Sequence, residues 1–180
     1  CIVYLADKYG ISLADISTGD YFVTEVDTER KLIDEINKFA PSEIICNESF
    51  YMSGVDLSDM KNRLGIAVYS LEAWYFSDET AENTLKEHFK VQSLEGIGLS
   101  DYACGTIAAG ALLRYLYETQ KNDLGNLSAI HPYSTGKYMI IDSSTRRNLE
   151  LVETLREKQK RGSLLWVLDK TKTAMGARTL

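Results

Sequence analysis

Apolar and polar residues alternate in three short segments at the start of the chain. These segments are residues 2–6, 10–16 and 21–26, and short polar turns that contain glycine separate them. Alternation of this kind predicts β-strands. Because a crossover between parallel strands takes about a dozen residues or more, turns this short predict that the three strands form an antiparallel meander.

A helical period replaces the alternation after this meander. We expect a helix that begins after an N-cap at Asp27 or Thr28 and ends before Pro41. Its predicted apolar face consists of Leu32, Ile33, Ile36 and Phe39. These residues recur at the spacing that places side chains on one side of an α-helix, so the helix should pack that side against the strands.

Strands and helices alternate in the next part of the chain. Apolar runs at 43–46 and 66–69 predict two short strands, and the segments 56–64 and 77–90 predict helices. A meander followed by this alternation predicts an α/β fold with a mixed sheet and flanking helices. This is the element order of ribonuclease H-like proteins.

A long apolar segment at 102–121 predicts a further helix, whose small residues suit close packing. Gly105 and Gly110 within it have the glycine spacing of a phosphate-binding loop. Ala111 and Leu112, however, stand where such a loop needs lysine and then serine or threonine. The segment therefore predicts a packed helix and no nucleotide site.

The last part of the chain predicts extended pieces followed by helices. Residues 130–133 and 137–141 are the extended pieces. Residues 142–144 include an expected N-cap for a charged helix that runs to Gly162, and a second capped helix should begin at Asp169. The chain stops within this second helix. We therefore expect the sequence to be a piece cut at both ends from a longer protein.

Charge is distributed unevenly over the 180 residues. The formal net charge is −6, and residues 142–180 hold nine Lys and Arg against five Asp and Glu, a local balance of +4. Residues 1–141 therefore carry −10. Phosphate binding needs clustered basic side chains, so this acidic part argues against a module that wraps DNA and indicates contact with protein. Weak DNA binding through residues 142–180 remains a third possibility.

Cysteine and histidine show no spacing typical of a metal site. Cys1, Cys46 and Cys104 form no C-x-x-C pair, and His88 and His131 are far from each other. We expect no zinc site and a reducing compartment. No apolar run approaches the roughly 20 residues of a membrane span, and no charged leader is present. The composition predicts a soluble, cytosolic protein.

A metal-dependent nuclease is the alternative function that a ribonuclease H-like fold suggests. Such a site needs several carboxylates that converge on two metal ions. The candidates are Asp7, Asp15, Asp20 and Glu48. Asp15 should alternate away from the core, Asp7 and Asp20 are typical turn residues, and the long helix supplies only Glu118. We favour structural roles for these acids. A G-x-S-x-G motif is also missing, so we expect no catalytic residues.

The aromatic residues raise the possibility of base stacking. Surfaces that bind single-stranded nucleic acid combine aromatic with basic side chains. The aromatic run Trp74-Tyr75-Phe76 lies between predicted elements, beside Glu72 and Asp78, and no Lys or Arg is interspersed with it. We interpret the aromatics as core or contact residues, with 74–76 as a candidate partner-facing patch.

Three segments resemble the MutS family of DNA mismatch repair proteins. They are Leu13–Gly19 (LADISTG), Thr145–Glu150 (TRRNLE) and Leu168–Leu180 (LDKTKTAMGARTL). The resemblance spans the chain and implies that residues 1–125 are the connector domain, which is ribonuclease H-like in this family. Residues 126–180 would be the beginning of the core, or lever, domain.

The resemblance also implies a function and its partners. The intact family protein binds mismatched DNA, ATP and magnesium, and acts as a homodimer in the bacterial cytoplasm, at the nucleoid during repair. Its mismatch-reading domain lies upstream of the matching segments and its ATPase downstream. The present chain would thus be a non-catalytic part without cofactors. It would relay between those domains and dock MutL, at residues that the resemblance does not specify.

The matching segments near the end of the chain are the expected interdomain junction. The residues are Thr145, Arg146, Arg147, Asn148, Glu150, Gly176 and Arg178. Arg146 and Arg147 follow an expected helix start, where positive charge opposes the helix dipole, so local helix stability does not explain them. We expect instead that the two arginines form bidentate pairs with carboxylates of another domain.

Overall fold

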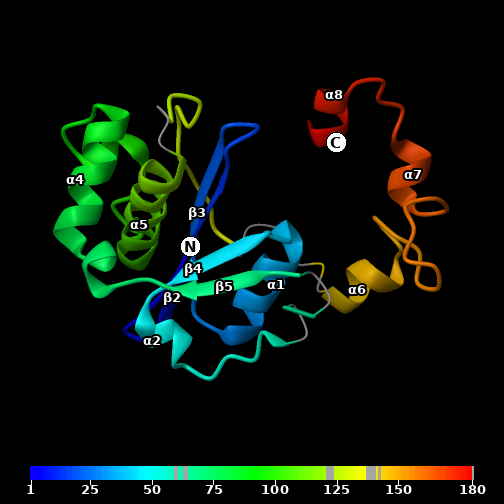
Figure 1. Ribbon diagram of the computed structural model, residues 1–180, viewed down its shortest axis with the longest axis horizontal. Coiled ribbons are helices and arrows are strands. Elements are labelled where there is room, and N and C mark those ends of the chain that lie inside the picture. The colour runs from blue at the N-terminus through cyan, green and yellow to red at the C-terminus, as the bar shows by residue number, and fades with distance from the viewer. Residues whose placement is uncertain (59–60, 63–64, 121–123, 137–140, 142, 180) are drawn as a thin grey trace. The chain divides into compact units, whose positions relative to one another are not determined.

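The computed structural model describes residues 1–58, 61–62, 65–120, 124–136, 141 and 143–179 (Figure 1). Its contacts divide the chain into two compact units. Unit 1 comprises Cys1–Lys137 and unit 2 comprises Tyr138–Leu180. The boundary predicted at 125/126 refers to the domains of a longer protein and stays a prediction.

The first three strands form the predicted antiparallel meander. Strand β1 (Ile2–Leu5) pairs with β2 (Lys8–Asp15), which pairs with β3 (Asp20–Val26). Ala6 and Asp7 join β1 to β2 with φ angles of 48° and 59°. Two consecutive residues of positive φ form the turn whose twist matches that of the flanking strands. This geometry explains how so short a connection is sufficient.

Three parallel strands extend the meander on both sides. Strand β4 (Glu43–Cys46) lies beside β1, β5 (Ala67–Ser70) lies beside β4, and β6 (His131–Pro132) lies beside β3. The sheet order is β5-β4-β1-β2-β3-β6. The predicted α/β fold with a mixed sheet is therefore confirmed. The predicted extended piece at 130–133 becomes the edge strand, and residues 137–140 of the next piece lie outside the described residues.

Helix α1 (Glu29–Phe39) covers one face of the sheet, as its apolar period predicts. Its N-cap is Thr28, whose side chain accepts a hydrogen bond from Lys31 N. The helix ends at Ala40, a left-handed residue before Pro41. Leu32 and Ile36 are buried in a core cluster with strand residues, which include Ile2, Ile11 and Ile44. Burial of this stripe is the main stabilisation of so short a helix.

Helix α5 (Ala103–Gln120) lies on the opposite face of the sheet with α4 (Asp78–Phe89) beside it (Figure 1). The close packing predicted for α5 depends on glycine at two places. A Cβ atom on Gly10 of β2 would lie 2.2 Å from the carbonyl oxygen of Cys104, and one on Gly110 would lie 2.3 Å from Cα of Ala81 in α4. Both contacts join backbone to backbone and leave no room for a side chain.

Several short elements complete unit 1. Helix α2 (Glu48–Tyr51) is not predicted by periodicity, and its N-cap is Asn47. One-turn 3₁₀ helices lie at η1 (Ala73–Phe76) and η2 (Leu94–Ile97). The predicted helix at 56–64 contains residues outside the described ones. Of its described residues, Ser58, Lys61 and Asn62 are helical, whereas Asp56 and Leu57 are not.

Unit 2 corrects two predictions. The charged helix does not run to Gly162, because α6 covers only Ser143–Asn148. Glu150 follows with a φ angle of 48°, and its carbonyl accepts a hydrogen bond of 3.0 Å from Leu164 N. The chain therefore folds back on itself where a continuous helix was expected. A left-handed residue ends a helix more effectively than the polar run to Gly162 extends it.

The second predicted helix start, at Asp169, is also wrong. Helix α7 (Leu164–Leu168) begins earlier, with Ser163 as its N-cap, and Asp169 follows its end. The Asp169 carboxylate instead accepts the backbone N–H of Thr171 at 3.0 Å. Helix α8 (Ala174–Thr179) starts only after Thr173, whose hydroxyl accepts from Gly176 N at 3.1 Å. Within the part of the chain that is described, no helix is both long and apolar enough for a bilayer span.

Candidate partner-docking surface

Trp74 presents an exposed indole ring on unit 1. The residue lies in η1 and is 44% exposed. Its Nε1–H donates a hydrogen bond of 2.7 Å to the Glu72 carboxylate, and its ring stacks on Tyr75 with centroids 3.9 Å apart and planes inclined by 26°. These contacts fix the orientation of a large aromatic side chain that the core does not bury.

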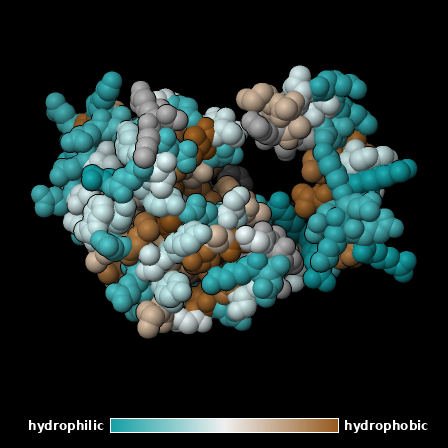
Figure 2. Space-filling view, in the orientation of Figure 1, coloured by the Kyte–Doolittle hydropathy of each residue, from teal (hydrophilic) through white to brown (hydrophobic). Residues whose placement is uncertain are grey.

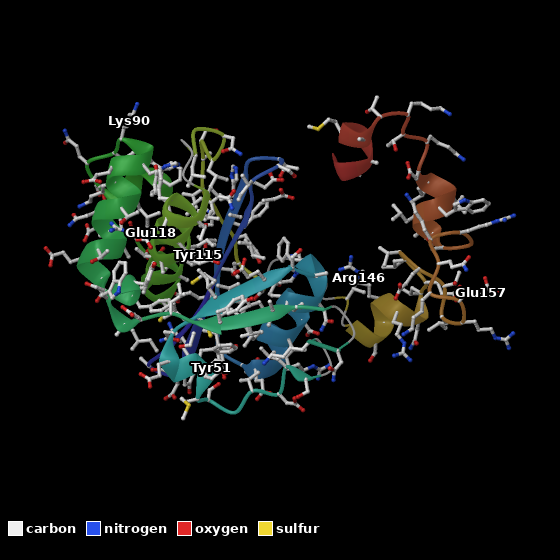
Figure 3. All side chains as sticks on the ribbon, in the orientation of Figure 1. Tyr51, Lys90, Tyr115, Glu118, Arg146 and Glu157 are labelled. Atoms are coloured by element: carbon white, nitrogen blue, oxygen red, sulfur yellow. The ribbon has the colours of Figure 1, made fainter. Side chains whose placement is uncertain are left out.

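Helix α5 supplies the polar groups that hold this aromatic pair. The Tyr75 hydroxyl donates to the Glu118 carboxylate, and Arg114 Nε donates to the same carboxylate at 3.0 Å. The Arg114 guanidinium also lies 5.6 Å from the centre of the Trp74 ring, within range of a cation–π contact. Figure 3 labels Glu118 on α5. We call Trp74, Tyr75, Arg114 and Glu118 the Trp74 surface.

The hydrogen bonds shift the acidity of two groups in the Trp74 surface. Hydrogen bonds from Tyr75 and then Arg114 lower the pKa of the Glu118 carboxyl. The same carboxylate raises the pKa of Tyr75 to about 12, because it accepts the phenolic proton. At neutral pH the arrangement is therefore an anionic Glu118 between a neutral phenol and a cationic guanidinium.

A shallow depression continues the Trp74 surface toward α4. It has a volume of about 380 Å³ and is lined by Thr84, Glu87, His88, Arg114, Tyr117 and Glu118. His88 Nδ1 lies 2.5 Å from the Tyr117 hydroxyl, and Nε2 lies 2.7 Å from the Leu127 carbonyl oxygen. The imidazole thus connects α4 to α5 and to the loop that follows α5.

The spacing of residues on α5 explains how one helix serves both the core and this surface. Leu112, Leu113 and Leu116 are buried against the sheet. Arg114 and Glu118 are four residues apart on the exposed side, a spacing that favours an ion pair. Sequence reasoning noted Glu118 only as a possible metal ligand and missed Arg114. The i, i+4 spacing of Arg114 and Glu118 was the available signal for their ion pair, but not for its contact with Trp74 and Tyr75.

The Trp74 surface is suited to binding protein. Trp, Tyr and Arg are the residues most enriched in binding hot spots. Here each is held by a neighbour in the free chain, so binding would cost little side-chain entropy. Figure 2 shows polar and apolar residues interspersed over unit 1 in this view, without one broad hydrophobic area. A partner would therefore need polar as well as apolar groups.

The four candidate nuclease carboxylates do not converge. Asp7 lies before β2 and Asp15 lies at its end, so about 25 Å separates them at the rise of an eight-residue strand. Asp20 pairs with Asp15, whereas Glu48 starts α2 near the Asp7 end of the sheet. All four are exposed. A two-metal centre needs ligands around ions about 4 Å apart, which these positions cannot provide.

The other candidate groups are also dispersed. Among the residues that the structure describes, no three His, Cys, Asp or Glu side chains are placed to hold a metal ion. Burial raises the pKa of the Cys46 thiol to about 11, which disfavours a reactive thiolate. His131 lies in β6 with its ring near Phe22.

The predicted junction residues all belong to unit 2. Thr145, Arg146, Arg147 and Asn148 lie in α6, where Arg146 is half-buried and Arg147 is exposed. Because α6 is so short, both arginines occupy its last turn, where positive charge is favourable. This corrects the argument that they oppose the helix dipole.

The remaining junction residues are separated from α6 along the chain. Glu150 accepts a hydrogen bond of 2.7 Å from Leu155 N. Gly176 lies in α8, and the side chain of Arg178 lies outside the described residues. The assignment of these residues to a junction stays a prediction.

The structure is an α/β domain with a mixed sheet and flanking helices, followed by a segment of short helices. A family model described as MutS domain II matches residues 1–129, and one described as MutS domain III matches residues 144–180. The chain therefore belongs to the MutS family of DNA mismatch repair proteins.

Curated relatives with the same family name align with nearly the whole chain. The DNA mismatch repair protein MutS of Lachnoclostridium phytofermentans is 63% identical over 179 residues, which cover 99% of this chain and 19% of the relative. The MutS protein of Ruminiclostridium cellulolyticum is 44% identical, over 96% of this chain and 20% of the relative. That of Protochlamydia amoebophila is 38% identical, over 99% of this chain and 21% of the relative. The chain thus spans about a fifth of their length.

Proposed function

We propose that this chain is a non-catalytic part of a MutS mismatch repair protein, and that unit 1 docks MutL through the Trp74 surface. The observation that carries the location is the exposed ring of Trp74, which stacks on the half-buried Tyr75 beside Arg114. The net charge of −10 over residues 1–141 supports a protein partner, because the phosphates of DNA would be repelled.

A titration tests this docking role. The ¹⁵N-labelled chain is titrated with the N-terminal domain of the cognate MutL at moderate salt, and amide shifts are followed by NMR. We expect shifts confined to η1, α4 and the exposed side of α5. Trp74→Ala should weaken binding at least tenfold, the size of a typical hot-spot loss of about 1–2 kcal/mol.

Two matched variants control for the loss of an exposed aromatic residue. Trp166 of unit 2 is 49% exposed, and Tyr51 of α2 is 55% exposed. Figure 3 labels Tyr51, which lies away from Glu118. Trp166→Ala and Tyr51→Ala should bind MutL as the unmodified chain does. Full affinity of Trp74→Ala would remove the Trp74 surface from the proposal. Absence of any shift at high concentration would leave only a mechanical role for unit 1.

The wider role that we propose is relay within a longer protein. Mismatched DNA, ATP and magnesium would be bound by other domains of a cytoplasmic homodimer, and this chain would connect the mismatch-binding, lever and ATPase domains. Family membership supports this role. The nuclease alternative loses its support, because Asp7 and Asp15 lie at opposite ends of β2.

A further inference from the structure

One edge of the sheet is a strand of two residues. Strand β6 comprises His131 and Pro132, and it lies parallel to β3 opposite Phe22 and Val23. Proline has no backbone N–H to donate, which is tolerated at the edge of a sheet. The pairing continues to Tyr133, whose N–H donates to the Val23 carbonyl at 2.9 Å. Strands β2 and β3 pair over seven positions, so the backbone ladder holds β6 much less firmly than it holds the inner strands.

This edge coincides with the connection between the two MutS family domains. The model of domain II matches residues up to 129, and the model of domain III matches residues from 144 onward. Structural contacts nevertheless place the chain up to Lys137 in unit 1. We call residues 131–136 the strap. Ile130, directly before it, is 7% exposed and packs in the core cluster that contains residues of α5, so the strap leaves from a fixed point.

Side chains of β3 and α1 hold the strap at Tyr133. The phenol donates to Glu35 Oε2 at 2.5 Å, and the Thr24 hydroxyl donates to the Tyr133 carbonyl at 2.7 Å. Lys38 Nζ lies 3.3 Å from the same Glu35 oxygen and 4.6 Å from the centre of the Tyr133 ring. Glu35 is 8% exposed, and a buried carboxylate needs such partners. Burial and then the bond to Glu35 raise the pKa of Tyr133, so the phenol keeps the proton that it donates.

A polar attachment of this kind can open without disrupting the core. When Tyr133 leaves, water hydrates both its hydroxyl and the Glu35 carboxylate, so the hydrogen bond is exchanged for bonds to water. Lys38 stays close to Glu35 on the same helix as its counterion. Three of the six strap residues are already exposed. Short ladders with exposed surroundings are the parts of native proteins that open locally.

We propose that the strap is a detachable part of the interdomain connection, which opens and closes at the contact between Tyr133 and Glu35 while the rest of unit 1 stays folded. In the closed state the free chain between the family domains begins after the strap. In the open state it begins after Ile130 and is six residues longer. At roughly 3.4 Å for each extended residue, opening adds up to about 20 Å to the reach of this connection.

Hydrogen exchange of the 180-residue chain tests whether the strap opens by itself. The Tyr133 N–H reports opening of the strap, and the Leu113 N–H, in the buried part of α5, reports unfolding of unit 1. We expect Tyr133 to exchange at least about tenfold faster than Leu113 after correction for intrinsic rates. Low concentrations of urea should accelerate Leu113 much more than Tyr133, because opening of the strap exposes little surface.

Two substitutions test the contact itself. Tyr133→Phe removes the hydroxyl and keeps the ring, so exchange at position 133 should become about fivefold faster or more. Glu35→Gln removes the charge that the phenol binds and should act in the same direction. Since both variants weaken the same hydrogen bond, the double variant should show less than the product of the two accelerations.

Tyr115→Phe is the matched control. Tyr115 is also half-buried, and its hydroxyl donates to Glu43 Oε1 at 2.6 Å, which links α5, where Figure 3 labels it, to β4. Because this bond persists when the strap opens, its loss should leave exchange at Tyr133 unchanged.

Two outcomes would overturn the proposal. Equal rates and equal urea dependence at Tyr133 and Leu113 would mean that β6 opens only when unit 1 unfolds. Unchanged exchange at position 133 in both Tyr133→Phe and Glu35→Gln would mean that their contact does not hold the strap. MutL plays no part in these measurements, so their failure would leave the proposed docking role untouched.

Discussion

Units 1 and 2 contain apolar residues of similar kinds but differ in what covers them. In unit 1, Leu112, Leu113 and Leu116 of α5 are at most 8% exposed, because the sheet lies against the helix. In unit 2, Leu164, Trp166 and Leu168 of α7 are between 48% and 60% exposed. Figure 2 shows such apolar residues at the surface of that unit. Burial, rather than local pattern, distinguishes a formed core from a potential one.

The largest expected effect compares leucines of the two units. Leu113→Ala removes a fully buried side chain and should lower the free energy of unfolding by about 2–5 kcal/mol. Leu168→Ala removes one that is 60% exposed and should change it by less than about 0.5 kcal/mol. Urea unfolding followed by circular dichroism measures both. Similar losses would mean that α7 contributes to a core as α5 does.

This difference explains which elements could be predicted from the sequence. The three strands of the meander and helices α1 and α4 each bury one side against a partner within unit 1, so their sequence pattern records the contact. Helix α5 was predicted from its long apolar run, because Cys104–Leu113 are buried without interruption. Helix α2 was missed because its start depends on Asn47, whose side chain also pairs with the backbone of Tyr4 across the sheet at 3.1 Å. A contact between residues 43 positions apart leaves no local period.

The errors in unit 2 have a related cause. The polar run before Gly162 resembles a helix surface, but no described helix of this unit buries a complementary stripe. The left-handed conformation of Glu150 then decided where α6 ends. For the Trp74 surface, the aromatic run indicated contact, whereas Arg114 and Glu118 required knowing that η1 lies against α5.

The second prediction tests close packing within unit 1. Gly110→Ala would normally stabilise a helix interior, by roughly 0.5–1 kcal/mol. Here the added Cβ would lie 2.3 Å from Cα of Ala81, so we expect a loss of about 1–3 kcal/mol instead. Gly96→Ala is the control, since no atom lies within 4 Å of its added Cβ. Thermal unfolding gives the sign. Stabilisation by Gly110→Ala would show that α4 and α5 can move apart freely.

The third prediction concerns pH and the amino group of Cys1. The residue is half-buried, but its amino group is enclosed and donates to Ser12 O, and burial lowers its pKa from 8.0 to about 5. Between about pH 5 and pH 8 the unfolded chain binds this proton and the folded chain does not. The free energy of unfolding should therefore fall as the pH decreases from 8 toward 5, by about 1 kcal/mol between pH 8 and pH 7. An N-terminally acetylated chain, which lacks this titration, should not show that decrease in urea unfolding.

The smallest effect on the stability of the chain is expected for the two arginines of α6. Here the effect of their position can be distinguished from the effect of their positive charge. Arg146→Ala with Arg147→Ala should change unfolding of unit 1 by less than about 0.5 kcal/mol, because both residues lie in unit 2. In the full-length protein we expect the double variant to weaken ATP-driven clamp formation, measured as sliding on end-blocked mismatched DNA.

Arg156→Ala with Arg161→Ala is the matched control for this variant, since it removes two exposed positive charges from the same unit. If residues 142–180 act only as a basic DNA-binding segment, both double variants should reduce salt-dependent binding about equally. If Arg146 and Arg147 pair with carboxylates of another domain, only their replacement should impair the clamp. Normal sliding by that variant would reject the junction role and leave the last turn of α6, where positive charge is favourable, as the reason for the two arginines.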